Sequence, residues 1–261
     1  MNLLTDGSVW QGHPRVSEQV AQIIEPHAPM GWINLCRPKL VEKSIREKVP
    51  IKAVVMVGDI RSSTILMRES IVPEKFADTM TAFIELVKST GQNSHGMWFD
   101  KFTGDGFLGY WLVDENLDQS VIRLVMEQSR KFLRFFETNI AQSFYENLRN
   151  VPRRSGLSIG IDSGEVHLLM VGGMLTIVGR PVVGAVRMVG AAKPYEMLAN
   201  YPIGSLIEKD EGMLKDKCAS VKSRMIKTKE FPDGQQVWSI IFEPPELRSD
   251  GKIRATIIRK Q

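Results

Sequence analysis

Two carboxylates, each placed just after a strand-like apolar run, constrain the fold of this chain more than any other feature. Residues 53–57 form an apolar run of the buried-strand type, which ends after one glycine in Asp59. Residues 97–99 favour a second strand, which leads through a Thr-Gly turn to Asp105. Two carboxylates on neighbouring strands could bind hard divalent cations, which prefer oxygen ligands and usually accompany phosphates. The sequence therefore predicts a metal and phosphate site between these strands.

The turn after Asp59 predicts an anion site beside the metal ligand. Four polar residues lead into a helix-like run over residues 65–68, namely Arg61, Ser62, Ser63 and Thr64. The first turn of a helix presents backbone N–H groups that have no intrahelical partners, and such groups bind anions. One strand–turn–helix unit thus offers both a metal ligand and a phosphate cradle.

Both aspartates also have ordinary structural explanations. An Asp after a strand commonly caps the next helix, and Asp-Gly is a frequent hairpin turn. Glycines stand close to each aspartate, with Gly104 in the second turn, and a glycine lets a ligand approach the backbone closely. The pairing of the two segments favours the functional interpretation.

Composition places the chain among ordinary globular proteins. Of its 261 residues 43% are hydrophobic and 25% charged. The net charge of +4 is mild, so it suits a small anionic ligand or a weak nucleic-acid contact and is a strong argument for neither. The two cysteines, Cys36 and Cys218, lie far apart, which fits a reducing cytosol and forms no metal motif. We find neither a membrane-spanning apolar run nor a secretory signal, and we expect a cytoplasmic protein.

The pattern of elements predicts an α+β fold of the ferredoxin-like type, a mostly antiparallel sheet with helices on one face and an exposed second face that invites dimerisation. Residues 1–50 form a helical N-terminal arm that packs on the core or on a second subunit, residues 51–243 the core, and residues 244–261 a C-terminal extension. Predicted helices cover residues 17–24, 40–48, 62–70, 73–89 (with Gly91 as C-cap), 117–149 and 181–198. Predicted strands cover residues 51–58, 96–102, 107–113, 155–162 and 165–171 (a hairpin), 175–178, 202–207, 219–229, 235–242 and 252–261.

Four segments, in this order, resemble the catalytic domain of class III nucleotidyl cyclases. Residues 57–64 and 101–107 are similar to the two metal-aspartate segments of that family. Residues 159–166 resemble a hairpin of the family, and residues 179–188 resemble the helix that carries its transition-state residues. The resemblance covers about residues 51–243, and four short motifs in the family's order are specific.

The resemblance implies a homodimer with shared active sites and two bound Mn²⁺ or Mg²⁺ ions. Asp59, the backbone carbonyl of Ile60 and Asp105 would hold the metals, and the ribose 3′-oxygen would attack the α-phosphorus without a covalent enzyme intermediate. Arg187 from the partner subunit would stabilise the charge that grows on the α-phosphate, and Lys229 would bind the triphosphate. The ordinary alternatives are a surface salt bridge for Arg187 and a solvated strand lysine for Lys229.

The base-reading positions depart from the purine-cyclase pattern. Lys101 matches one of them, but Thr176 stands where the family usually has Asp or Cys, and Val183 stands where it has a ribose-orienting Asn. Three bulky residues nearby would leave less room for a two-ring base if one faced the pocket, although core packing explains them as well: Trp98, Phe99 and Phe102.

A smaller base is therefore expected, and the chain resembles the stand-alone bacterial anti-phage pyrimidine cyclases of Pycsar systems, which make cyclic UMP or cyclic CMP. Lys101 can only donate hydrogen bonds, and uracil offers two carbonyl acceptors whereas the amino group of cytosine needs an acceptor, so UTP is favoured over CTP. The resemblance further implies a separate effector protein that senses the cyclic nucleotide.

Three other functions remain open on the sequence. Lys101 also suits an adenylate cyclase that makes cyclic AMP. A relative that binds a nucleotide without turnover is a second alternative, although intact aspartates and Arg187 oppose it. The third is a response-regulator receiver with Asp59 as phosphoacceptor, which requires a parallel sheet.

Overall fold

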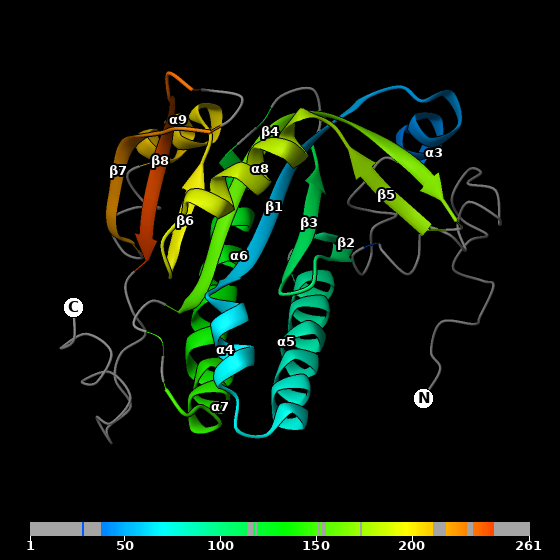
Figure 1. The fold of residues 1–261 in the computed structure, drawn as a ribbon. Helices are drawn as coiled ribbons and strands as arrows, with labels where there is room; N and C mark the ends of the chain where they lie inside the picture. The colour runs from blue at the N-terminus through cyan, green and yellow to red at the C-terminus, as the bar shows by residue number, and fades with distance from the viewer. Residues whose placement is uncertain are drawn as a thin grey trace.

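The structure is a computed structural model and describes residue 28 and residues 38–94, 96–113, 117, 119–150, 152, 155–172, 174–210, 218–228 and 232–242. Its central element is strand β1 (Ile51–Arg61), which pairs antiparallel with β3 (Gly106–Leu112) on one side and with β4 (Gly156–Val171) on the other (Figure 1).

The remaining elements extend this sheet or pack on it. The other strands are β2 (Trp98–Phe102), β5 (Met174–Val178), β6 (Glu196–Ala199), β7 (Cys218–Ile226) and β8 (Gln235–Phe242). The helices are α3 (Pro38–Glu47), α4 (Ser63–Glu69), α5 (Pro73–Ser94), α6 (Gln119–Phe135), α7 (Ala141–Glu146), α8 (Arg180–Ala191) and α9 (Tyr201–Lys209), with a π-helical segment, Phe136–Ile140, between α6 and α7.

The strand order confirms the predicted α+β class with a mostly antiparallel sheet. Neighbouring strands follow the order β2-β3-β1-β4-β6-β8-β7, and β5 pairs with β4 outside this path. Among the described pairs, only β4 and β6 run parallel. The receiver alternative is therefore excluded, because that fold needs a parallel sheet.

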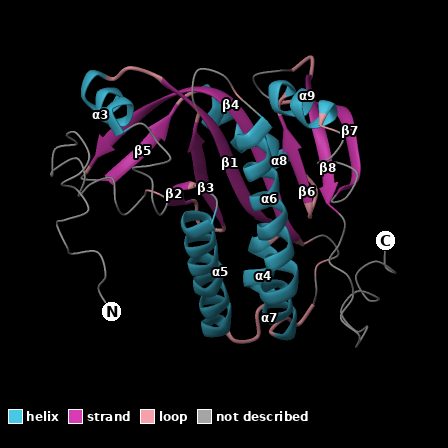
Figure 2. Cartoon of the chain, turned by 180° about the vertical axis from the view of Figure 1, so that it is seen from behind, coloured by secondary structure: helices cyan, strands magenta, loops and turns pink. Residues whose placement is uncertain are grey.

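Helices cover both faces of the sheet, which corrects the prediction that they cover one. Val54 and Met56 of β1 belong to a core shared with α5, α6 and α7, whereas Val55 and Val57 belong to a second core shared with α3, α8 and β5. Successive side chains of a strand face opposite sides, so an apolar run such as β1 requires cover on both. Helix α8 crosses β4 and β1 in front of the sheet in Figure 1, and Figure 2 shows α5 and α6 from behind.

Strand β4 is continuous, so the predicted hairpin at Ser163-Gly164 is wrong. The pairing with β1 runs through this dipeptide without interruption, with Gly164 opposite Ala53 and Val166 opposite Ile51. A full ladder of backbone hydrogen bonds outweighs a local turn preference. The hairpin instead joins β4 to β5 and projects as an arm beyond the sheet (Figure 1).

Three further predictions are wrong: the end of α8, the type of element at residues 202–207 and the role of Gly91. Helix α8 stops at Ala191 and residues 196–199 form strand β6, because Pro194 cannot continue a helix. Residues 202–207 lie in helix α9, where the Asn200 side chain caps the N–H of Ile203, and not in a strand. Gly91 lies inside α5, where its missing side chain makes room for Met97.

The other predicted elements are present with shifted ends, and helix α3 confirms the helix predicted over residues 40–48. The helix predicted over residues 17–24 and the strand over 252–261 lie outside the described residues. Within the described part of the chain, no helix is both long and apolar enough to span a membrane.

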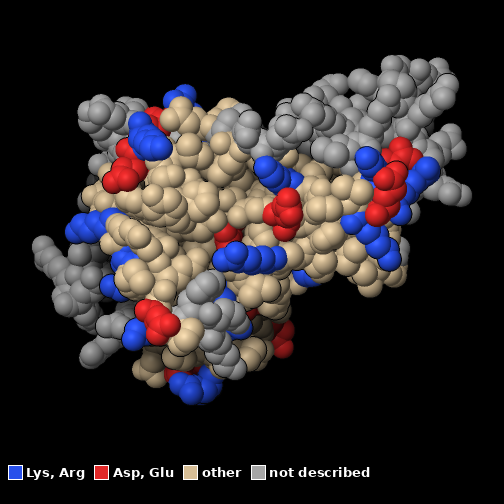
Figure 3. Space-filling view, turned by 90° about the horizontal axis from the view of Figure 1, so that it is seen from above, with Lys and Arg blue, Asp and Glu red and all other residues tan. Residues whose placement is uncertain are grey.

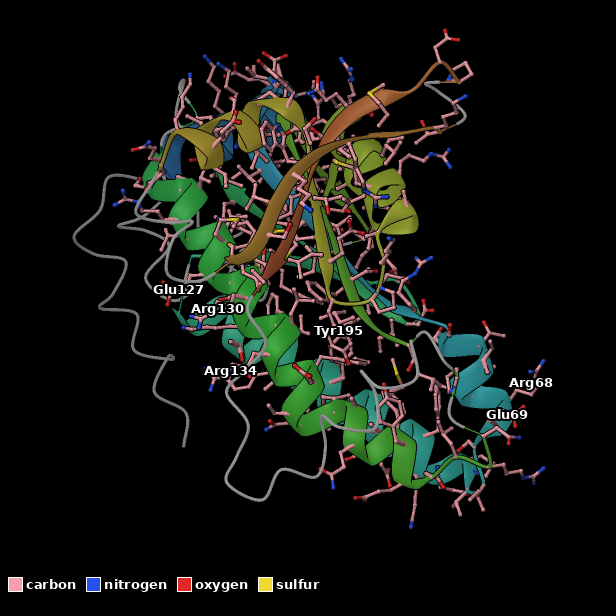
Figure 4. The ribbon with its side chains drawn as sticks, turned by 90° about the vertical axis from the view of Figure 1, so that its left-hand side faces the viewer. Arg68, Glu69, Glu127, Arg130, Arg134 and Tyr195 are labelled. Atoms are coloured by element: carbon pink, nitrogen blue, oxygen red, sulfur yellow. The ribbon has the colours of Figure 1, made fainter. Side chains whose placement is uncertain are left out.

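Charged residues of both signs are mixed on the described surface. Seen from above, Lys and Arg lie in small groups with Asp and Glu (Figure 3). Along α6, Glu127, Arg130 and Arg134 project from the helix (Figure 4), and Lys131 lies 3.6 Å from Glu127. Glu127 and Arg134 are exposed and Arg130 and Lys131 are half-buried, so this face of α6 is solvated surface.

Helix α8 sits directly on β4, and glycines allow the close approach. A side chain at Gly160 would collide with the backbone of Ala185, and one at Gly184 would collide with the carboxylate of Asp162. Asp162 is buried and accepts hydrogen bonds from the backbone N–H of Ser163 (2.8 Å) and the side chain of Asn200. Burial raises the pKa of Asp162 to about 6.

This buried carboxyl predicts a pH-dependent stability. Because its pKa is about 6 when folded and 3.8 ordinarily, the folded chain holds the proton more tightly, so the stabilisation is full below about pH 4 and is lost as the pH rises through about 6. Asp162→Asn keeps both hydrogen bonds to Oδ1 and removes this loss. Relative to wild type, its free energy of unfolding in urea should rise by up to about 3 kcal/mol between about pH 4 and about pH 7.

The control is Asp78→Asn on the exposed face of α5, which should change the free energy of unfolding by less than about 0.5 kcal/mol at both pH values. A difference between Asp162→Asn and wild type that does not change with pH would contradict the assignment.

Candidate active site

The register of β1 and β3 brings the two predicted carboxylates together. Asp59 is directly opposite Gly106, the residue after Asp105, and the backbone N–H of Ile60 donates to the Asp105 carbonyl at 3.1 Å. Both aspartates are half-buried. The site therefore lies where β1 ends beside the turn between β2 and β3.

The two carboxylates influence one another electrostatically. Burial, followed by the neighbouring Asp105 carboxylate, raises the pKa of Asp59, whereas the Arg61 guanidinium acts in the opposite direction. The Ser63 hydroxyl donates a hydrogen bond to Asp105 Oδ2. Two adjacent carboxylates that disfavour each other's charge are a suitable donor set for a hard cation, which relieves the repulsion.

The two carboxylates suit divalent cations whose remaining ligands are water molecules or substrate oxygens. Among the described residues no group of three or more His, Cys, Asp or Glu side chains surrounds one point. Mg²⁺ is commonly bound through one or two carboxylates together with substrate phosphates, and Asp59 and Asp105 supply that number.

Arg61 connects the carboxylates to helix α8. Its guanidinium lies 3.0 Å from Asp59 Oδ2 and donates to the carbonyls of Val189 (3.3 Å) and Gly190 (3.2 Å). Carbonyls in the last turn of a helix carry the negative end of the helix dipole and attract cations. The structure thus shows Arg61 as a link between Asp59 and α8, and its predicted contact with phosphates stays a prediction.

The predicted phosphate cradle after Asp59 is a short turn and helix. Helix α4 has seven residues and begins after Ser62, which has a positive φ of 64°. Ser63 is engaged by Asp105, and Thr64 at the start of the helix is exposed. Of the four polar residues, Arg61 contacts Asp59 and Ser63 contacts Asp105.

Glycines around the aspartates serve packing as well as access. A side chain at Gly58 would collide with the ring of Phe107, and one at Gly106 would collide with the carbonyl of Gly58. Gly104, at a φ of 90°, has no atom within 4 Å of where a Cβ would stand. Only this last glycine fits the prediction that the turn leaves open space for a ligand.

Lys101 and Thr176, the two predicted base-reading residues, are in contact. The Lys101 ammonium donates to Thr176 Oγ1 at 3.1 Å, although the residues lie 75 positions apart. Strand β2 carries the lysine and strand β5 carries the threonine, so the arm formed by β4 and β5 brings Thr176 to Lys101.

The bulky residues near Lys101 pack mainly in the interior. Trp98 is fully buried and stacks on Tyr110, with ring centroids 5.9 Å apart. Phe99 is buried and contacts Phe102, with ring centroids 4.6 Å apart. Trp98 therefore does not narrow a pocket, and only the half-buried Phe102 remains a candidate for that role.

Val183 and Arg187 lie on the exposed side of α8, opposite the buried Ala185 and Met188. They are four residues apart and so share one face of the helix. That face points away from the sheet. Lys229 lies outside the described residues.

Sequence reasoning missed Asp100, which contacts both Lys101 and Thr176. In the sequence this residue reads as an ordinary strand position, and a polar residue inside a run of aromatic residues is the only signal that could have marked it.

No protein-family model and no curated protein sequence matches the chain. Solved structures do match. The adenylyl cyclase CyaB from P. aeruginosa is 20% identical with a TM-score of 0.61, over 77% of this chain and 98% of that chain. The guanylyl cyclase Cya2 is 17% identical with a TM-score of 0.57, over 76% and 96%.

The guanylate cyclase domain of RhGC from Catenaria anguillulae, solved in complex with GTP, is 15% identical with a TM-score of 0.57, over 74% of this chain and 97% of that one. The matches span nearly the full length of these catalytic domains. This chain therefore has the fold of the class III nucleotidyl cyclase catalytic domain.

Proposed function

We propose that this chain is a nucleotidyl cyclase that converts a pyrimidine nucleoside triphosphate, UTP before CTP, to the 3′,5′-cyclic monophosphate and pyrophosphate. The observation that carries the proposal is the pair Asp59 and Asp105, held together by the register of β1 and β3 in a fold shared with adenylyl and guanylyl cyclases.

Asp59, Asp105 and the carbonyl of Ile60 would hold two divalent cations, Mn²⁺ or Mg²⁺, which when bound would lower the pKa of the ribose 3′-hydroxyl and neutralise the triphosphate. The 3′-oxygen attacks the α-phosphorus in line, its proton leaves to solvent, and the bond to the bridging oxygen breaks to release pyrophosphate. The chain's own task is to position the triphosphate and to stabilise its charge.

The second subunit of a homodimer would supply Arg187. Val183 and Val186 of α8 are 49% and 45% exposed, and the arm carries the exposed Val171, Met174 and Val178. Apolar side chains exposed along one arm and one helix mark an interaction surface. A copy that covers this surface would bring its Arg187 to the α-phosphate, and Lys229, with Arg61 to Thr64, would contact the remaining phosphates.

The departures from the purine-cyclase pattern support a pyrimidine. Lys101 and Thr176, which contact each other, would form the hydrogen-bonding pair of the base subsite, and Val183 cannot make the ribose hydrogen bond that an Asn would make. We further propose that the reaction takes place in the cytoplasm, and that its product is a second messenger of antiviral defence that a separate effector protein senses. These points rest on the resemblance to Pycsar cyclases.

Product identification tests the proposal. The purified chain is incubated with Mn²⁺ and equimolar ATP, GTP, CTP and UTP, and the cyclic products are identified by mass. Cyclic UMP is expected as the main product, followed by cyclic CMP. Cyclic AMP as the main product would support an adenylate cyclase instead, and nucleotide binding without any pyrophosphate release would support a non-catalytic relative.

Removal of either carboxylate should abolish turnover. Asp59→Asn and Asp105→Asn keep the size of the side chain and remove its charge, so the rate should fall by at least about three powers of ten while the dimer persists on size-exclusion chromatography. Asp233→Asn, in the exposed turn before β8, is the matched control and should retain full activity. Near-normal turnover in either active-site variant would refute the metal assignment.

Shared active sites predict complementation between inactive variants. Arg187→Ala should lower the rate by about 10³-fold or more. If one subunit supplies the aspartates and the other supplies Arg187, an equal mixture of Arg187→Ala and Asp105→Asn chains regains roughly a quarter of wild-type activity, because half of the dimers contain one intact site. A mixture of Asp59→Asn and Asp105→Asn chains is the control and should stay inactive, and the first mixture staying equally inactive would argue against sharing.

A further inference from the structure

Strand β2 departs from regular alternation at Asp100. Phe99 and Lys101 pair with consecutive residues of β3, so Asp100 is an extra residue without a partner across the ladder. In a regular strand, the side chains of Asp100 and Lys101 would face opposite sides of the sheet. A bulge redirects side chains, and here those of both residues reach Thr176 of β5.

The Asp100 carboxylate is fully engaged and excluded from water. Its side chain is 0% exposed, whereas that of Lys101 is 53% exposed. Oδ1 accepts the backbone N–H of Ile177 at 3.0 Å, and Oδ2 accepts the Thr176 hydroxyl at 3.2 Å and lies 3.2 Å from the Lys101 ammonium. A buried carboxylate is tolerated when it has such partners.

These contacts fix what the base subsite can present to a ligand. A threonine hydroxyl has a single proton and can serve as donor or acceptor. Because Thr176 gives its proton to Asp100, only a lone pair of its oxygen remains for a ligand. Lys101 directs one N–H to Thr176 and one to Asp100, and its third N–H remains. The subsite thus offers one donor beside one acceptor.

We propose that Asp100 is a positioning residue that sets the nucleobase preference of this site by holding Thr176 as an acceptor and Lys101 as the adjacent donor. The inference rests on the proposed function, since Lys101 and Thr176 must meet the base. Such a pair is complementary to a base edge with an acceptor next to an N–H, as in O4 and N3–H of uracil or in N3 and N4–H of cytosine.

The variant Asp100→Asn reverses one hydrogen bond. In the variant, the Ile177 N–H still needs an acceptor, so the amide oxygen of the new side chain occupies the position of Oδ1. The NH₂ group then occupies the position of Oδ2 and donates to the Thr176 oxygen. The Thr176 proton then turns toward the ligand and the subsite offers two donors. Cytosine has two adjacent acceptors, O2 and N3, whereas in uracil an N–H separates the two carbonyls.

The experiment measures cyclic products from an equimolar mixture of UTP, CTP, ATP and GTP with Mn²⁺. In Asp100→Asn the ratio of cyclic CMP to cyclic UMP should rise about tenfold over wild type, as expected when one hydrogen-bonding group of a site is inverted. In a Thr176→Val background, Asp100→Asn should not change this ratio, because no hydroxyl remains to be turned.

The matched control is Glu196→Gln, which removes the charge of another buried carboxylate. Glu196 pairs with Arg224 at 2.9 Å and lies in β6, on the side of β4 away from β1 and β2. Its loss should lower stability without changing the product ratio. A merely structural role for Asp100 would likewise lower all four rates together, and an unchanged product ratio in Asp100→Asn would overturn the proposal.

A second variant covers the case in which Asp100→Asn does not fold. Thr176→Val keeps the bond between Asp100 and Ile177 but removes the hydroxyl, so it too should change the product ratio, and an unchanged ratio would overturn the proposal. If wild type gives no cyclic product, the proposed function fails. In that case the dissociation constants of the four nucleoside triphosphates are measured, and the ratio of the constant for CTP to that for UTP replaces the product ratio. An equal ratio in wild type and both variants overturns the role of Asp100.

Discussion

The antiparallel pairing of β1 with β3 is the interaction on which the rest of the site depends. It places Asp59 opposite Gly106 and so brings Asp105 alongside. A slip of one residue would turn every side chain of β1 to the other face of the sheet. That slip is costly because both faces of β1 are packed, one against α5 and α6 and the other against α8. The hydrophobic core therefore fixes the distance between two carboxylates that repel each other.

Arg61 and the close packing of α8 on β4 hold the carboxylates and helix α8 in a fixed relative position. Arg61 bonds to Asp59 and to two carbonyls near the end of α8, while the packing of Gly160 and Gly184 holds the helix against β4. The exposed side of this helix carries Arg187. A shared active site would need this arrangement, because a residue that serves the partner must be held as firmly as the aspartates it meets there.

The sequence predicted elements well where the local signal and the tertiary context agree, as in β1 and in the turn that carries Asp105. It was wrong where long-range pairing overrides a local preference. The dipeptide Ser163-Gly164 has a turn preference, but its pairing with β1 keeps it in an extended strand. Residues 196–199 have a helix-like pattern, but they form a strand between β4 and β8. Gly91 reads as a helix end, yet its function is to admit Met97, a contact that no local window contains.

The sequence by itself determined which groups are available: two aspartates after strand-like runs, the polar turn after the first of them, Lys101, and the apolar run that had to be buried on both sides. Only the tertiary structure decided which of them meet. Thr176 comes to Lys101 because β5 folds back along β4, and Asp100 joins them because a bulge in β2 redirects its side chain. The physical reason is that such contacts depend on the register of strands distant in sequence, which the whole core sets cooperatively and no short segment encodes.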